Sequence, residues 1–161
     1  MKNLHCYSEA AQYYQVPAIV LRAIHHVEGG HAGSRVPDAN GTFDHGFMQI
    51  NSCWKASLNT RGWSMRFVTQ HDCANIFAAA WILKQHLQAT QGNLWLAVAD
   101  YHSADHRYGY PYVVKAYRYI QNKAVNRNQP GTLDRHGDRV KPGDRVQPGD
   151  RVQPINVRFM P

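Results

Sequence analysis

The feature that most constrains this chain is an apolar stripe at helical spacing that ends in a carboxylate and two glycines. Apolar side chains recur every three or four residues from Ala18 to Val27, and Glu28 lies at the edge of the stripe. Val16-Pro17 predicts the helix start, because proline fits the first turn. Gly29-Gly30 predicts its end, because glycine readily adopts the left-handed conformation that ends helices. We therefore expect a helix that carries an acid at its buried edge.

Glu28 is one of only two glutamates, the other being Glu9 on a polar helix face. A half-buried carboxyl group loses hydration, which disfavours its charged form and raises its pKa. A glutamic acid tuned to roughly pKa 6–7 donates a proton at neutral pH. The alternative is a glutamate that merely ends a helix at the surface, and spacing alone does not exclude it.

Length and composition predict one domain with an extension. The chain has 161 residues, of which 43% are hydrophobic, enough for one packed core. We expect no transmembrane segment, because no run of about 18 apolar residues occurs. The first residues lack the apolar run of a secretory signal, so either the chain stays in the cytosol or a signal was removed.

The charge balance favours anionic partners. The net charge is +7 and the isoelectric point is near 9.5. Nucleic acid, acidic membrane and anionic wall polymers all fit such a balance. No dense basic run with interleaved aromatics appears, which argues against nucleic-acid binding.

Helical patterns dominate residues 1–126. We expect helices over 7–15, 16–27, 52–58, 73–89, 94–101 and 111–122. The segment 73–89 is apolar on more than one face, which predicts a central buried helix. Asn40-Gly41 indicates at most one small hairpin, and Tyr108 to Pro111 is expected to be a turn. The fold class is therefore mainly α.

Residues 127–161 differ in kind. Gly137-Asp138-Arg139-Val140-Lys141-Pro142 recurs twice more, with glutamine in place of Lys141. Proline and glycine every six residues with alternating charge cannot build a packed core. We predict a flexible tail.

A second group of residues suits amino-sugar recognition. A glycine, Gly46, allows close approach of the backbone to a ligand, and amide side chains bind sugar hydroxyl and acetamido groups. The candidate binding residues are Gly46, Met48, Gln49, Asn51, Tyr101 and His102. A tyrosine at position 101 is in addition expected to hydrogen-bond Glu28.

A metal site is not expected from the ten histidines. His26-Val27-Glu28 resembles the H-x-E of zinc deaminases but lacks the P-C-x-x-C partner. His26 and His31 do not have the spacing of a zincin helix. The three cysteines are far from any CxxC pattern, and spacing alone leaves a disulfide and three reduced thiols equally open.

Four stretches of the chain carry motifs in a characteristic order: Glu28-Gly29-Gly30, residues 40–52 with Gly-Phe-Met-Gln-Ile-Asn, Asp72-Cys73-Ala74-Asn75-Ile76, and Tyr101-His102-Ser103. Together they resemble the lytic transglycosylase domain, in particular its small forms attached to type III and type IV secretion, conjugation and pilus systems. The match runs from Cys6 to about Ile120, some three-quarters of the chain, with the motifs in the family's order.

The resemblance implies a lysozyme-like fold and cleavage of the β-1,4 bond between N-acetylmuramic acid and N-acetylglucosamine in peptidoglycan. Glu28 stands at the family's catalytic glutamate, the product is a 1,6-anhydro sugar, and no metal or cofactor is implied. It also implies a Cys6–Cys73 disulfide with Cys53 free. From the resemblance we expect the partners to be glycan strands and components of a secretion or pilus apparatus. We also expect a periplasmic monomer whose signal has been removed.

The sequence departs from the family pattern in three places. Gly29 stands where the family usually has serine, and the usual secretory signal is not seen. Tyr101-His102-Ser103-Ala104 stands where larger relatives have Tyr-Asn-Ala-Gly, in a form that resembles the small secretion-linked branch.

Two alternatives stay open. The run from Asp44 to Ser52 also resembles animal-type lysozymes, which would make Asp44 the second carboxylate of a hydrolase. Asp44 can equally be a turn residue beside Gly46 with no part in the reaction. The other alternative is that the domain binds glycan as part of an assembly and has little catalytic activity.

Overall fold

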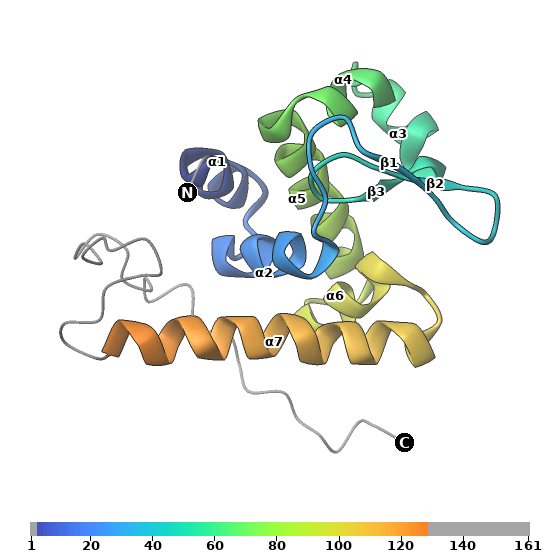
Figure 1. The fold of residues 1–161 in the computed structure, drawn as a ribbon. Helices are drawn as coiled ribbons and strands as arrows, with labels where there is room; N and C mark the ends of the chain where they lie inside the picture. The colour runs from blue at the N-terminus through green and yellow to red at the C-terminus, as the bar shows by residue number, and fades with distance from the viewer. Residues whose placement is uncertain (1–2, 129–161) are drawn as a thin grey trace.

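The computed structural model describes residues 3–128 of the chain, and Figure 1 shows their arrangement. The elements in chain order are α1 (Leu4–Tyr14), α2 (Ala18–Glu28), β1 (Arg35–Pro37), β2 (Phe43–His45), β3 (Ile50–Asn51), the 3-10 turn η1 (Ser52–Trp54), α3 (Lys55–Asn59), α4 (Met65–Gln70), α5 (Asp72–Ala89), α6 (Leu94–His102) and α7 (His106–Asn128).

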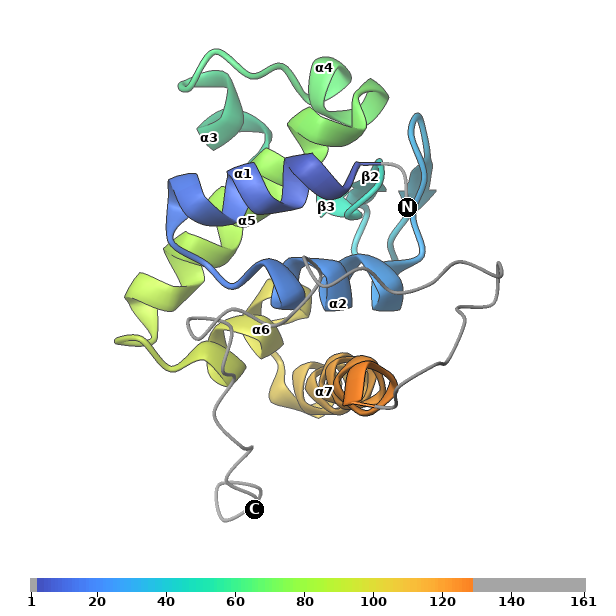
Figure 2. The same ribbon diagram turned by 90° about the vertical axis from the view of Figure 1, so that its left-hand side faces the viewer.

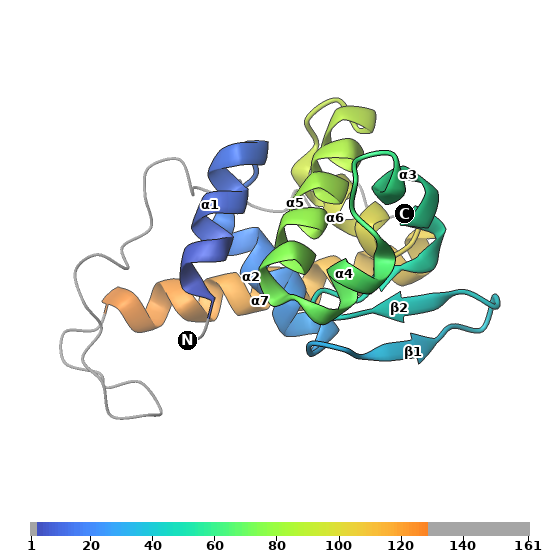
Figure 3. The same cartoon turned by 90° about the horizontal axis from the view of Figure 1, so that it is seen from above.

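Helix α5 is the centre of the packing. It contacts α1, α4 and α6, and also α2 and β3. An almost unbroken run of its residues, Asn75, Ile76 and 78–83, is buried, as expected for a helix with neighbours on several sides. In Figures 1 and 3, α1 and α6 lie beside it and α4 lies at its N-terminal end. The prediction of a central buried helix at 73–89 is confirmed.

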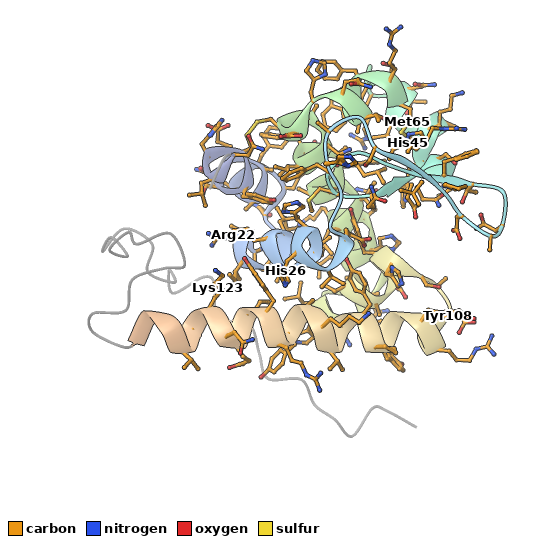
Figure 4. The ribbon with its side chains drawn as sticks, in the orientation of Figure 1. Arg22, His26, His45, Met65, Tyr108 and Lys123 are labelled. Atoms are coloured by element: carbon orange, nitrogen blue, oxygen red, sulfur yellow. A yellow bond between two sulfur atoms is a disulfide. The ribbon has the colours of Figure 1, made fainter. Side chains whose placement is uncertain are left out.

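Helices α2 and α7 form the second packing unit. Figure 2 views α7 end-on, with α2 between it and α1. His26 of α2 stacks on Tyr119 of α7 with ring centroids 4.5 Å apart, and the Lys123 ammonium lies 5.7 Å from the same ring. Figure 4 shows His26 and Lys123 in the space between the two helices. This pairing brings the C-terminal end of α2 against α7.

The three strands form one small antiparallel sheet in the order β1-β2-β3. Val36 pairs with Asp44, and His45 pairs with Ile50. The Asp38 amide donates to the Thr42 carbonyl across the turn that contains Asn40-Gly41. The predicted hairpin is confirmed, and β3 adds a short third strand to it.

A buried asparagine fixes this sheet to the helices. Asn75 on α5 is fully buried. Its Oδ1 accepts from the Met48 amide at 2.6 Å, and its Nδ2 donates to the carbonyls of His45 and Val68 at 3.2 and 3.1 Å. These three buried bonds join α5 to α4, to β2 and to the following loop, so Asn75 specifies how β2 and the loop lie on the helices.

A disulfide joins the starts of α1 and α5. Cys6 and Cys73 are bonded, with Cα atoms 5.3 Å apart, and Cys53 is free and exposed. This is the pairing that the resemblance implies. Asn3 reinforces the junction, because its Nδ2 donates to Asp72 Oδ2 at 2.8 Å.

The mainly α, lysozyme-like fold class is confirmed, with differences at two helices. Helix α4 was not expected, because only Met65, Val68 and Thr69 of its six residues are buried and the signal is weak; Ser64 caps it. The turn expected at Tyr108 to Pro111 is wrong, since these residues belong to α7. Pro111 lies early in that helix, where a missing amide hydrogen removes a single bond.

The predicted flexible tail, 127–161, lies outside the described residues except for the end of α7, and the boundary at 126 stays a prediction. Within residues 3–128, none of the helices has the length and apolar character that crossing a membrane requires.

We predict that Asn75→Ala lowers the free energy of unfolding by about 2–4 kcal/mol, because it removes three buried hydrogen bonds. Urea denaturation followed by circular dichroism measures this loss. Asn59→Ala, at an exposed position, is the control and should change stability by less than about 0.5 kcal/mol. Equal effects of the two substitutions would contradict the assigned role.

Candidate active site

Glu28 is the last residue of α2 and its side chain is only 14% exposed. Tyr112 of α7 donates its hydroxyl hydrogen to Glu28 Oε1 at 2.7 Å. The carboxyl group is therefore held between two helices at a position that still reaches solvent. The alternative of a glutamate that merely ends a surface helix does not fit this burial.

Burial raises the pKa of Glu28 from its ordinary 4.5 to about 7. The hydrogen bond from Tyr112 opposes the rise by stabilising the carboxylate, and the negative charge of Asp44 adds to it. The carbonyl end of α2 is also a poor place for a negative charge. At neutral pH this acid is partly protonated and can both give and take a proton.

His102 completes the surroundings of the acid. It is the last residue of α6, its ring stacks on Tyr112 with centroids 4.4 Å apart and planes 9° from parallel, and its Nδ1 lies 3.9 Å from Glu28 Oε1. Burial lowers the pKa of His102, while the charge of Asp44 acts in the opposite direction. The imidazole therefore covers one face of the Tyr112 ring and lies near the carboxyl group.

Asp44 is held on the central strand β2. Asn51, its partner on β3, donates from Nδ2 to Asp44 Oδ1 at 2.9 Å and to Thr42 Oγ1 at 2.7 Å. Burial raises the pKa of Asp44, and the hydrogen bond from Asn51 opposes this rise. Since its charge acts on both Glu28 and His102, the structure brings Asp44 and Asn51 to the same region as the acid.

The two glycines of this region make close backbone contacts. A Cβ on Gly30 would lie 2.3 Å from the Gly46 carbonyl oxygen and 2.8 Å from Gln49 Nε2. A Cβ on Gly46 would lie 2.5 Å from Asn75 Nδ2. Gly46 was expected to let a ligand approach the backbone, but the atoms close to it belong to the protein itself. Both glycines instead let the 46–49 loop pack against α2 and α5.

Gln49 is fixed by that contact. Its Nε2 donates to Ser34 Oγ at 3.0 Å and to the Gly46 carbonyl at 2.7 Å. Its backbone has a φ of 50°, a left-handed conformation that costs energy in a residue with a side chain. The half-buried side chain is thus held in one position by the loop.

Two sequence predictions at this site are wrong in detail. The side chain of Met48 is fully buried in the core, so it offers no apolar surface to a ligand. Tyr101 does not hold Glu28, because its hydroxyl donates to the Met48 carbonyl at 3.0 Å. Burial raises the pKa of Tyr101, and the negative charges of Glu28 and Asp44 act in the same direction.

Sequence reasoning missed Tyr112 and the structural role of Asn75. Tyr112 follows Pro111 by one residue and lies 84 positions from Glu28, so no local pattern connects them. The helical spacing of Tyr112 and Ala116, which are both buried in α7, is the one pattern that could have indicated an inward-facing Tyr112.

The geometry defines a lysozyme-like domain with one sheltered acid at the end of a helix. A family model described as the transglycosylase SLT domain matches residues 5–111. The chain therefore belongs to the transglycosylase SLT domain family.

Two curated relatives carry the same name, Protein IpgF. The one from Shigella flexneri is 32% identical over 99 residues, which are 61% of this chain and 64% of the relative. The one from Shigella sonnei is 31% identical over the same shares. The matched region spans less than two thirds of either relative.

We predict that Glu28→Gln stabilises the protein above pH 7 but not near pH 4. With a pKa of about 7 instead of 4.5, folded Glu28 retains its proton where the unfolded chain loses it, so wild-type stability falls as pH rises through this window. Because glutamine does not ionise, the variant should gain up to roughly 3 kcal/mol by pH 8.

Urea denaturation at pH 4, 6 and 8 tests this dependence. Glu9→Gln, on the exposed side of α1, is the matched control. A difference between Glu28→Gln and wild type that stays constant with pH would show that Glu28 is not the desolvated acid described above.

Proposed function

We propose that the domain is a lytic transglycosylase that cleaves the β-1,4 bond between N-acetylmuramic acid and N-acetylglucosamine in peptidoglycan, with Glu28 as its catalytic acid and base. The observation that carries the proposal is the burial of Glu28, which raises its pKa to about 7, together with its hydrogen bond from Tyr112. Family membership gives the reaction class.

The reaction needs one group that first gives and then takes a proton. Protonated Glu28 donates its proton to the glycosidic oxygen as the bond from that oxygen to the muramic C1 breaks. The carboxylate that forms keeps the hydrogen bond from Tyr112. It then removes the proton of the muramic C6 hydroxyl as that oxygen bonds to C1, which leaves a 1,6-anhydro sugar and a protonated Glu28.

The groups near Glu28 suit an amino sugar. Gln49 and Asn51 present amide groups that are held by the loop and the sheet. His102 and Tyr101 add an imidazole and a hydroxyl near the acid. We assign these four residues to glycan binding, and Gly46 and Met48 to positioning Gln49 and Tyr101.

Hydrolysis is the alternative reaction, and the effect of the Asp44 charge on Glu28 is the observation that favours it. In a hydrolase a second carboxylate activates water or attacks C1 itself. In a transglycosylase the sugar supplies its own nucleophile, and Asp44 only holds Asn51.

The cellular setting follows from the same proposal. A peptidoglycan substrate and the Cys6–Cys73 disulfide both support a location in the periplasm, because that compartment holds peptidoglycan and is oxidising. There it opens the wall locally for a secretion, conjugation or pilus machine, in line with the resemblance to the small forms attached to such systems. We propose that it acts as a monomer.

Purified peptidoglycan incubated with the protein, followed by mass spectrometry of the soluble fragments, tests the reaction. We expect 1,6-anhydro ends from wild type and a loss of at least about 100-fold in turnover from Glu28→Gln. Fragments with reducing ends would support hydrolysis. No release by folded wild type would support a glycan-binding module without activity.

Asp44→Asn separates the two reactions. We expect this variant to keep turnover within about tenfold of wild type and to yield anhydro ends, because asparagine still accepts from Asn51 and no second carboxylate is needed. A loss as large as that of Glu28→Gln would instead make Asp44 a catalytic group.

Tyr112→Phe tests the hydrogen bond to the acid. The variant should lower kcat by about 10- to 100-fold, the effect of losing a hydrogen bond to a charged group. It should also shift the alkaline limb of the pH–rate profile to higher pH, because the lost hydrogen bond had lowered the pKa of Glu28. Tyr110→Phe, whose hydroxyl bonds to His106, is the control on the same helix. An unmoved limb would contradict the assignment.

A further inference from the structure

The starts of α1 and α5 place three potential metal ligands together. His5 Nε2 lies 3.2 Å from Cys6 Sγ and 3.9 Å from Cys73 Sγ. The three ligand atoms lie within 4.8 Å of one another, and no other such group of three occurs among residues 3–128. Neither the proposed reaction nor the resemblance gives His5 a role. We propose that, when the disulfide is reduced, Cys6, Cys73 and His5 form a Zn²⁺ site.

The spacing fits a tetrahedral zinc ion. Bond lengths of about 2.3 Å to sulfur and about 2.0 Å to nitrogen place tetrahedral ligands roughly 3.5–3.8 Å apart. The two nitrogen-to-sulfur distances, 3.2 and 3.9 Å, lie on either side of that range. The sulfur atoms need only separate from bonding distance to about 3.8 Å, a local movement at the first turns of two helices.

The surroundings keep the ligands together without the disulfide. Asn3 donates to Asp72 Oδ2 across the same junction, and Cys6 and Tyr7 are buried in the core between α1 and α5. Figure 3 shows α1 lying alongside α5. Reduction therefore leaves the three side chains close together rather than releasing one of them.

The local charge also favours a cation. Asp72 is the neighbour of Cys73, and its Oδ1 is buried with no hydrogen-bond partner in the described part of the chain. A bound Zn²⁺ would compensate this charge. Cys6 is buried, whereas His5 is exposed, so the ion can enter from the side of the imidazole and a water molecule can take the fourth position.

Zinc binding and the disulfide exclude each other. A small dithiol supplies two electrons and two protons, breaks the bond between the sulfur atoms, yields two thiols and is itself oxidised to a disulfide. Zn²⁺ then displaces both thiol protons and binds the two thiolates. The same two cysteines thus close a covalent bridge in an oxidising compartment and bind zinc in a reducing one, with His5 contributing only to the second state.

Metal titration of the reduced protein tests the proposal, with Cys53→Ser as the background because Cys53 is the free thiol. The protein is reduced with a dithiol, which is removed under oxygen-free buffer, and then titrated with Co²⁺. We expect one ion per chain, with the charge-transfer absorption of cobalt-bound thiolate and the visible bands of a tetrahedral site. Zn²⁺ should displace the Co²⁺ stoichiometrically and raise the Tm of the reduced protein, but not of the oxidised protein.

His5→Ala should weaken binding by about tenfold or more, while His31→Ala, at another exposed histidine, should leave it unchanged. Thermal unfolding of the oxidised variants verifies that both are folded. The proposal would be overturned by absence of cobalt-thiolate absorption in the reduced protein. Equal affinities of His5→Ala and the background protein would also overturn it, as would failure of Zn²⁺ to raise the Tm. All three readouts are independent of peptidoglycan cleavage.

Discussion

The hydrogen bond from Tyr112 to Glu28 is the interaction on which the account of the site depends. It joins the end of α2 to α7, two helices that the packing of His26 on Tyr119 also holds together. Burial at this junction raises the pKa of the acid, and the bond stabilises the carboxylate that forms when the proton leaves. The helix contact therefore sets both the protonation state of the acid and its ability to recover the proton.

A second constraint positions the remaining polar groups. Asn75 fixes the loop that carries Gln49, and Gly30 and Gly46 allow this loop to approach α2 and α5. The small sheet then holds Asp44 and Asn51 across adjacent strands. His102 of α6 lies 3.9 Å from the acid, and the charge of Asp44 on β2 acts on it. Hydrogen bonds and packing hold these groups in place, which is the usual requirement for a site of defined geometry.

Patterns that depend on near neighbours could be predicted from the sequence. The helix that ends at Glu28, the central helix α5 and the hairpin at Asn40-Gly41 each follow from local spacing or turn chemistry. Contacts between distant residues could not. The partner of Glu28 proved to be Tyr112 rather than Tyr101, and Met48 proved to be buried, because the helix that covers each of them comes from far along the chain.

The most direct test of the central claim is a carbon-13 NMR titration of the protein labelled at the glutamate side-chain carboxyl carbon. The chain contains only Glu9 and Glu28, so the spectrum holds two signals and substitution of either residue assigns them. The account predicts that the Glu28 signal titrates with a pKa of about 7 and that this pKa rises in Tyr112→Phe. A Glu28 signal that titrates near its ordinary pKa of 4.5 would contradict it.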